Sequence, residues 1–209
     1  MQTLKDDVRE RIVDSAKAEF LEKGIDKASM RDIAAGSNMT VGNLYRYFRN
    51  KEELNSFIVG ETLSEINRLV MEKSSNTVSI NDRDMDINLT VSQYADVLDD
   101  LADELVDIYK KHKVEFNILM MHSKLNDSIT DWFADLIKHI IKSNYGLDEY
   151  DRQIGVLSHG YAVSVFAGIK DIFRHADVET DSLKNMIKIF FRSYINNLSA
   201  DFSLALGEK

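Results

Sequence analysis

The 209-residue chain contains no proline and only 9 glycines. These two residues most disfavour a helix interior, proline by roughly 3 kcal/mol and glycine by about 1 kcal/mol relative to alanine. A chain that lacks the first and is poor in the second can form long, uninterrupted helices. With 44% apolar residues it can also bury a core. The composition therefore favours an all-α protein of one large or two smaller domains.

The absence of cysteine excludes disulfides, thiolate metal sites and cysteine nucleophiles. The first residues, MQTLKDDVRERIV, lack the apolar stretch of a secretory signal peptide. The longest charge-free run, Gln153–Ile169, contains several polar residues. It indicates a buried helix better than a membrane span, which needs roughly 20 mostly apolar residues. We expect a cytoplasmic protein with no membrane partner.

The net charge of −9 is unevenly distributed along the chain. Residues 1–51 hold 10 Lys/Arg and 8 Asp/Glu, whereas residues 52–209 hold 16 and 27. Within residues 27–51, five basic residues accompany a single acid, Asp32. A basic patch on a small module of an acidic chain is typical of a phosphate-binding surface, although such charges also occur simply as a solvated face.

The N-terminal residues predict a helix from about Asp6 to Lys23. Ile12, Ala16 and Phe20 repeat at helical spacing and supply its buried stripe. Gly24 follows where a helix stop requires a positive φ. The next stretch, SMRDIAAGSNMTVGNLYRYFRNKEE, predicts a short helix, a tight turn, a second helix and a capped third.

Local capping signals define this helix-turn-helix layout. Ser29 is suited to cap the first helix, with Asp32 as its capping-box partner. Asn38 can adopt the left-handed conformation that the turn requires. Thr40 caps the second helix, and Leu44 shares an inward face with Phe48. The layout is that of a DNA-reading module.

The segments RIVDSAKAEFLEKG, SMRDIA and MTVGNLYRYFRNKEEL together resemble the N-terminal signature of the tetracycline-repressor (TetR) family of transcriptional regulators. The resemblance covers about 45 residues, from Arg9 to Leu54, which is roughly a fifth of the chain. One departure is that Ser37-Asn38 stands where the family often has Ala-Gly in the turn.

The resemblance implies a division of roles within the module. Some residues match positions that contact phosphates and set the register: Thr40, Tyr45, Tyr47 and Lys51. Others match positions that face the base edges: Val41, Gly42, Asn43 and Arg46. Arg31 could either contact a phosphate or simply be a solvated helix residue. For Tyr45 and Tyr47, the alternative to a phosphate contact is ordinary packing of the ring. A cation in the first turn of a helix is mildly unfavourable, so Lys51 also suggests an anion alongside it.

Apolar residues at helical spacing continue through residues 51–73, which we predict to connect a helix-turn-helix DNA-binding domain (1–51) to a helical effector-binding and dimerisation domain (52–209). The polar stretch 74–88 predicts a long loop. Helices are predicted again from Thr90 to the C-terminus. The helix 151–173 is apolar on nearly every side and should be buried from more than one direction.

Small residues recur every four positions at Gly160, Ser164 and Gly168, and would let another helix approach closely. The TetR resemblance implies that the last two long helices pair with their copies in a second subunit. The expected contacts are Gly160, Ser164, Gly168, Phe190, Phe191 and Tyr194. Such a homodimer would meet a palindromic double-stranded DNA operator at two major grooves.

The resemblance also implies a small-molecule effector that releases the DNA. Its expected pocket is rich in aromatic and methionine side chains, which suits a hydrophobic ligand, although such a set can equally be plain core. The expected lining is Tyr94, Phe116, Met120, Met121, His122, Trp132, His159 and Phe166.

Two alternative interpretations of the sequence stay open. An enzyme or metal-dependent protein lacks support, because the chain has no phosphate-binding loop, nucleophile motif or HExxH, and we predict no metal or cofactor. Asp135 and His139 form a close i,i+4 ligand pair along the sequence, but such pairs are usually surface contacts. A helical partner-binding protein with a vestigial helix-turn-helix is the second alternative.

Overall fold

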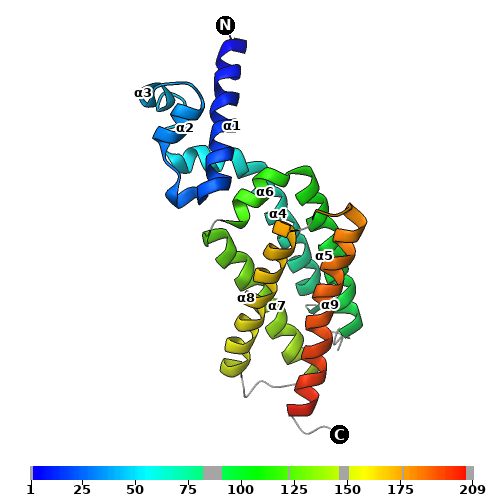
Figure 1. Cartoon of the computed structure of the whole chain (residues 1–209). Helices are drawn as coiled ribbons and strands as arrows, with labels where there is room; N and C mark the ends of the chain where they lie inside the picture. The colour runs from blue at the N-terminus through cyan, green and yellow to red at the C-terminus, as the bar shows by residue number, and fades with distance from the viewer. Residues whose placement is uncertain (1, 82–90, 122, 146–150, 176, 206–209) are drawn as a thin grey trace. The chain divides into compact units, whose positions relative to one another are not determined.

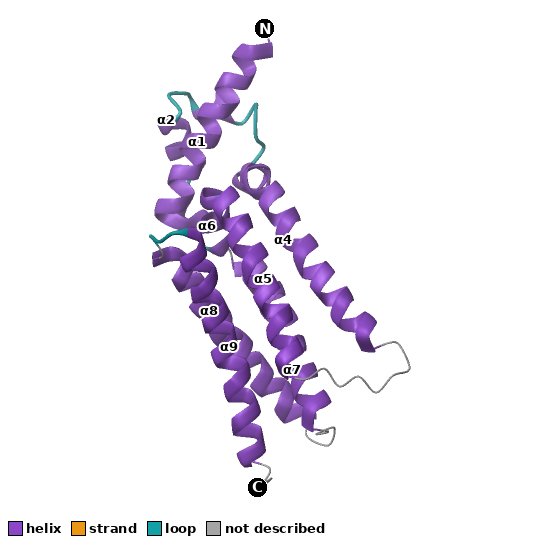
Figure 2. Cartoon of the chain, turned by 90° about the vertical axis from the view of Figure 1, so that its right-hand side faces the viewer, coloured by secondary structure: helices purple, strands orange, loops and turns teal. Residues whose placement is uncertain are grey.

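The computed structural model describes residues 2–81, 91–121, 123–145, 151–175 and 177–205. Within these residues every regular element is a helix, and no strand occurs (Figure 2). This confirms the predicted all-α class. The helices are α1 (Gln2–Lys27), α2 (Met30–Gly36), α3 (Val41–Leu44), α4 (Lys51–Asn81), α5 (Val91–Lys111), α6 (Lys113–Met120), α7 (Ser123–Tyr145), α8 (Asp151–His175) and α9 (Thr180–Ala205).

Internal packing divides the chain into two compact units. The first contains residues 1–65 and 111–123, and the second contains residues 66–110 and 124–209 (Figure 1). The helix-turn-helix elements therefore share a unit with the first half of α4 and with α6. The predicted domain boundary at residue 51 falls inside the first unit. The unit extends further because α6, which is distant in sequence, packs against α1.

In the first unit, α1 packs against both α2 and α6. The predicted stripe of Ile12, Ala16 and Phe20 is fully buried. Gly24 has a φ of 73°, as expected for a helix stop, but helical hydrogen bonding resumes beyond it and α1 reaches Lys27 across a kink. An ion pair between Lys17 of α1 and Glu115 of α6, 2.6 Å long, adds a polar contact.

In the second unit, α5 and α9 are joined by a ladder of ion pairs. Aspartates spaced four residues apart on α5 face basic residues spaced four apart on α9, so each pair lies one helical turn from the next. The pairs are Asp99–Arg192, Asp103–Lys188 and Asp107–Lys184. Beside them, the rings of Tyr109 and Phe173 lie 4.6 Å apart in the core.

The predicted loop at 74–88 is wrong for its first part. Helix α4 continues through Asn81, about two turns beyond the predicted end at Lys73. Residues 74–81 contain no proline or glycine, so nothing in the backbone chemistry stops the helix, even though Ser, Asn and Thr are poor helix formers. Residues 82–88 of the predicted loop lie outside the described residues.

None of the helices, so far as the chain is described, is both long and apolar enough to cross a membrane. The charge-free stretch inside α8 is interrupted by serine, histidine and glycine, as its sequence indicates.

Asn38 tests the backbone requirement of the turn, because its φ is 57°. Asn38→Gly should keep or slightly raise the free energy of unfolding, since glycine adopts this conformation without a Cβ penalty. Asn38→Val should lower it by about 1–2 kcal/mol. Urea unfolding followed by circular dichroism measures both, and equal losses in the two variants would contradict a backbone origin.

Candidate nucleic-acid interface

The turn between α2 and α3 is held by hydrogen bonds from its own residues. Ser29 accepts a hydrogen bond from the Asp32 amide at 3.1 Å and begins α2, as predicted. At the other end, the buried Ser37 hydroxyl donates to the carbonyl oxygens of Ile33 and Ala34. Asn38 then takes the left-handed conformation, which confirms its predicted role and directs the chain into α3.

Helix α3 begins at a capped N-terminus and is anchored from behind. The Thr40 hydroxyl accepts a hydrogen bond from the Asn43 amide at 3.3 Å. The side chain of Leu44 is fully buried, and that of Phe48 is 2% exposed, as predicted. Regular α-helix ends at Leu44, but the amides of Tyr45 and Phe48 still bond back to carbonyls one turn earlier. The predicted second helix is thus one α-helical turn extended by a looser turn.

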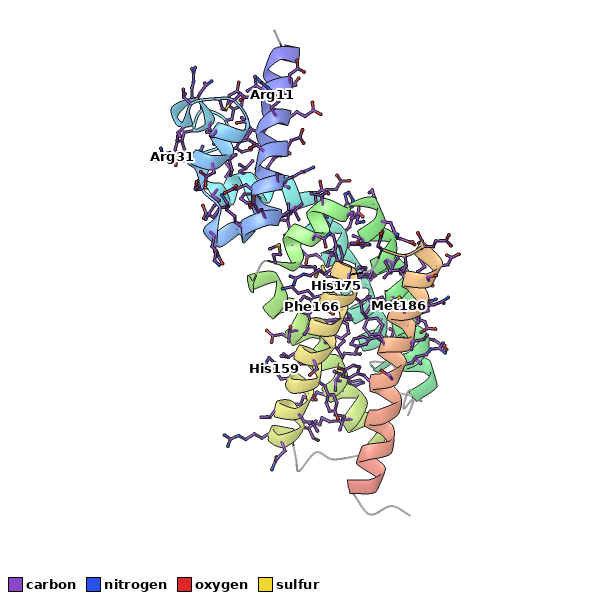
Figure 3. All side chains as sticks on the ribbon, viewed as in Figure 1. Arg11, Arg31, His159, Phe166, His175 and Met186 are labelled. Atoms are coloured by element: carbon purple, nitrogen blue, oxygen red, sulfur yellow. The ribbon has the colours of Figure 1, made fainter. Side chains whose placement is uncertain are left out.

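The residues around this anchor point outward. Thr40, Gly42, Asn43 and Arg46 are exposed, and Tyr45 retains 49% of its surface. The side chains of Val41 and Tyr47 are half-buried. The structure therefore brings the predicted base-facing residues and most of the predicted phosphate contacts onto one short, convex segment. Arg31 is exposed on α2 (Figure 3).

No close contact within the described chain requires a glycine at position 42. A Cβ placed on it would meet no atom within 4 Å. Its cost as a helix residue is therefore not offset by a close approach inside the protein, and a side chain there would project into the exposed surface.

The single acid of the basic segment, Asp32, has a basic partner outside that segment. The Asp32 carboxylate lies 3.2 Å from the Lys23 ammonium. Its hydrogen bond with Ser29 and, next, its contact with Lys23 lower the pKa of Asp32. Lys23 also binds Glu19 at 2.8 Å, which is the main cause of its raised pKa. Because Lys23 is shared between two carboxylates, it offsets the charge of Asp32 only in part, while Arg31, Arg46 and Arg49 face solvent.

Lys51 has a partner that the sequence did not reveal. Its ammonium donates to the carbonyl oxygens of Asp26 at 3.1 Å and Ala28 at 3.2 Å, at and just beyond the end of α1. A cation at a helix C-terminus is favourable because the carbonyls there carry partial negative charge. Because these carbonyls already supply acceptors, the position of Lys51 in the first turn of α4 does not by itself require an anion, and its phosphate contact stays a prediction.

The first turn of α4 is capped as its sequence predicts. Asn50 accepts a hydrogen bond from the Glu53 amide, and the Glu53 carboxylate accepts one from the Arg49 amide, both at 2.7 Å. Sequence reasoning missed Arg9, whose guanidinium lies 4.3 Å from the ring centroid of Phe57 and 5.4 Å from that of Phe48. This cation–π contact joins α1 to the residues behind the exposed segment.

The predicted effector-pocket residues are divided between the two units. Phe116 and Met120 are buried in the first unit, whereas Trp132, His159 and Phe166 belong to the second. Met121 is 38% exposed. His122 and the side chain of Tyr94 lie outside what the structure describes.

A groove in the second unit, between α7 and α8, contains two of the predicted pocket residues. It has a volume of about 460 Å³ and is lined by both apolar and polar side chains. His159 and Phe166 both project from α8 (Figure 3). The lining residues are Thr130, Asp131, His159, Val163, Phe166, Ala167 and Lys170.

Helix α8, predicted to be buried from more than one direction, keeps one apolar face exposed within a single chain. Val156 is 72% exposed and Val163 48% exposed, on the face that also carries Gly160 and Ser164. On α9, Met186 (Figure 3) is 42% and Ile189 68% exposed. These residues form an apolar surface over two helices that pack against each other.

Two of the predicted dimer residues are instead used inside the chain. A Cβ on Gly168 would overlap the ring of Phe190, so this glycine lets α8 and α9 approach each other. Phe191 is 1% exposed and its ring packs 5.9 Å from that of Phe133 in the core. Phe190 and Tyr194 are half-buried, with their rings 5.1 Å apart.

Comparison with known proteins places residues 12–55 within a family model described as bacterial regulatory proteins, tetR family. Over 46 residues the chain is 37% identical to the probable acrEF/envCD operon repressor of Escherichia coli (strain K12), a match that covers 22% of this chain. It spans only 21% of that protein's length, about a fifth.

Solved structures extend the likeness to most of the chain. A TetR-like transcriptional regulator from Rhodococcus sp. RHA1 matches with a TM-score of 0.54 at 15% identity, covering 88% of this chain and 92% of that one. NalD, the secondary repressor of the MexAB-OprM multidrug efflux pump in Pseudomonas aeruginosa, matches with a TM-score of 0.51 at 19% identity, covering 90% and 95%. At these identities the likeness shows a shared fold.

Lys51→Met should destabilise the protein in the absence of DNA. It removes two charge-assisted hydrogen bonds to α1, a loss of about 1 kcal/mol once the partial exposure of the site is considered. Thermal unfolding of the free protein measures this, with Arg46→Met, an exposed position on the same module, as the control. A Lys51→Met variant as stable as the parent would contradict the structural role of this lysine.

Proposed function

We propose that this chain, which belongs to the tetR family of bacterial regulatory proteins, is a cytoplasmic repressor that binds a palindromic operator as a homodimer and is released by a small effector. The observation that carries the proposal is the exposed segment 40–46, whose polar side chains face outward while Leu44 anchors it from within. The E. coli relative is named an operon repressor, which supports repression rather than activation.

The residue types on the segment suit the major groove of DNA. Asn43 can make a bidentate contact to adenine, Arg46 can read guanine, and Val41 can pack on a thymine methyl group. Thr40, Tyr45 and Tyr47 would bind phosphates and set the register without reading sequence. Gly42 leaves room for the segment to approach the groove floor.

Charge distribution directs this approach. Residues 52–209 carry 27 acidic and 16 basic residues, so most of the chain repels a polyanion. The basic stretch 27–51, whose one acid is paired with Lys23, is the part that attracts it. We infer that electrostatics help to orient the protein on DNA as well as contribute affinity.

The exposed apolar face of α8 and α9 supports the homodimer. Val156, Val163, Met186 and Ile189 are each at least 42% exposed, and exposed apolar side chains gathered on two paired helices are of the kind that marks protein interfaces. A two-fold axis through such a surface would pair it with itself and place two copies of segment 40–46 on successive major grooves, about 34–36 Å apart.

We propose the groove between α7 and α8 as the effector site. Phe166 and Val163 supply apolar contacts, while Asp131, His159 and Lys170 supply polar groups, which suits a largely hydrophobic ligand with one or two polar groups. Because Val163 also lies on the apolar face of α8, a ligand there can act on the proposed dimer contact.

Binding selection on random DNA duplexes tests the DNA-reading proposal. The parent protein should enrich a palindrome. Tyr45→Ala should weaken binding to all duplexes alike and leave the slope of log K against log salt nearly unchanged, because the neutral tyrosine hydroxyl binds a phosphate without releasing a counterion. Asn43→Ala should instead relax the preference at one base, at a cost of about 1–3 kcal/mol.

An unchanged enriched sequence with Asn43→Ala would remove this residue from base reading. If neither the parent nor the variants enriched any sequence at low salt, the regulator proposal itself would fail and the partner-binding alternative would stand.

A charge on the apolar face tests the dimer. Ile189→Glu should convert the protein to a monomer at micromolar concentration, because a carboxylate would be desolvated in the interface. Met71→Glu is the matched control, since Met71 on α4 is 69% exposed against 68% for Ile189. Sedimentation equilibrium measures the mass. A dimeric Ile189→Glu variant would exclude this face as the interface.

A further inference from the structure

We propose that the first unit contains a binding site for a divalent transition-metal ion, with Glu61, Glu65 and His112 as its protein ligands. The two glutamates lie one helical turn apart on α4, and the histidine stands between α5 and α6. Among the described residues, this is the one group of three or more His, Cys, Asp or Glu whose ligand atoms all lie within 4.8 Å of one another.

The distances fit a small ion. The Nε2 atom of His112 lies 3.3 Å from the Oε1 atom of Glu65 and 4.0 Å from that of Glu61. In a tetrahedral site with metal–ligand bonds of about 2.0–2.1 Å, two ligands stand roughly 3.3–3.4 Å apart. One edge of the tetrahedron is thus already formed. The two edges that end at Glu61 need a small movement of its side chain, which is 72% exposed and free to make it.

The ligand types select a class of ion. One imidazole nitrogen with two carboxylate oxygens suits zinc and the neighbouring divalent first-row metals, whereas calcium and magnesium prefer oxygen ligands alone. Three protein ligands leave the fourth position to water. His112 is only 12% exposed, so its ring is already held in place at the end that faces the glutamates.

Lys111 now occupies the position of the cation. Its ammonium lies 2.5 Å from the nearest oxygen of Glu65 and 3.5 Å from that of Glu61. The lysine side chain is 56% exposed, so it can turn into water when a divalent ion takes its place, and an exposed ion pair of this kind contributes little to stability. Lys111 is therefore a built-in competitor of the metal.

The structure also provides an internal control. His175 and Asp171 on α8 form an exposed pair, with the Nδ1 atom 3.2 Å from the carboxylate oxygen. It is a histidine–carboxylate contact of similar length, but it is not part of any such group of three among the described residues. It should bind metal far more weakly than the His112 group.

The test is a calorimetric titration of the chelator-treated full chain with Zn²⁺, and with Co²⁺ followed by its visible absorption. We expect binding of one ion per chain, with the intense Co²⁺ bands of a four-coordinate site. His112→Gln and Glu65→Gln should each weaken binding about tenfold or more. Lys111→Ala should tighten it, because the competitor is gone. His175→Gln should change nothing.

Binding that is unaffected by His112→Gln and Glu65→Gln, or lost equally in His175→Gln, would overturn the proposal, as would the absence of binding in both the parent and Lys111→Ala. Thermal unfolding of each variant identifies loss of the fold, and the tightening expected for Lys111→Ala cannot arise from misfolding. Operator binding is measured separately on the metal-free protein, so this site can fail while the proposed regulator function stands.

Discussion

The burial of Leu44 and Phe48 is the interaction on which the proposed DNA surface depends. These two side chains leave almost no surface to solvent, and removing a buried side chain of this size costs about 2–5 kcal/mol. Because Leu44 and Phe48 fill the inner side of one short helical turn, the residues between and around them face outward. The same contact that stabilises the module thus also fixes which side chains a partner can meet.

Leu44 and Phe48 can stay buried only because the surrounding elements fix the backbone of this segment. Asn38 sets the direction in which the chain enters α3, Thr40 caps it, and Lys51 binds carbonyls at the end of α1. The guanidinium of Arg9 packs over the rings of Phe57 and Phe48. A segment of four α-helical residues would not be stable alone, so its conformation has to come from these neighbours.

What the sequence predicts well is local. Capping by Ser29 and Thr40, the left-handed turn at Asn38 and the buried stripe of α1 depend on residues a few positions apart, whose chemistry constrains one another directly. Contacts between distant residues escape such reasoning. Lys51 contacts Ala28, 23 residues earlier, and His112 contacts Glu65, 47 residues earlier, so only the packed helices reveal either contact.

The C-terminal helices show the same limit in another form, because periodicity does not distinguish an apolar face buried in the chain from one left for a partner. Phe191 and Ile189 both lie on α9, yet one is 1% and the other 68% exposed. Packing decides between them, since the core holds a limited number of side chains at close contact.

Nuclear magnetic resonance of the complex with a selected duplex tests most sharply whether segment 40–46 reads DNA. Backbone amide signals of residues 40–46 should shift strongly on addition of this duplex, and more weakly with an unrelated one. Signals from the exposed face of α8 and α9 should show no direct contact with DNA. If residues 40–46 kept their free signals while the protein bound DNA through another surface, segment 40–46 would not be the DNA-reading surface.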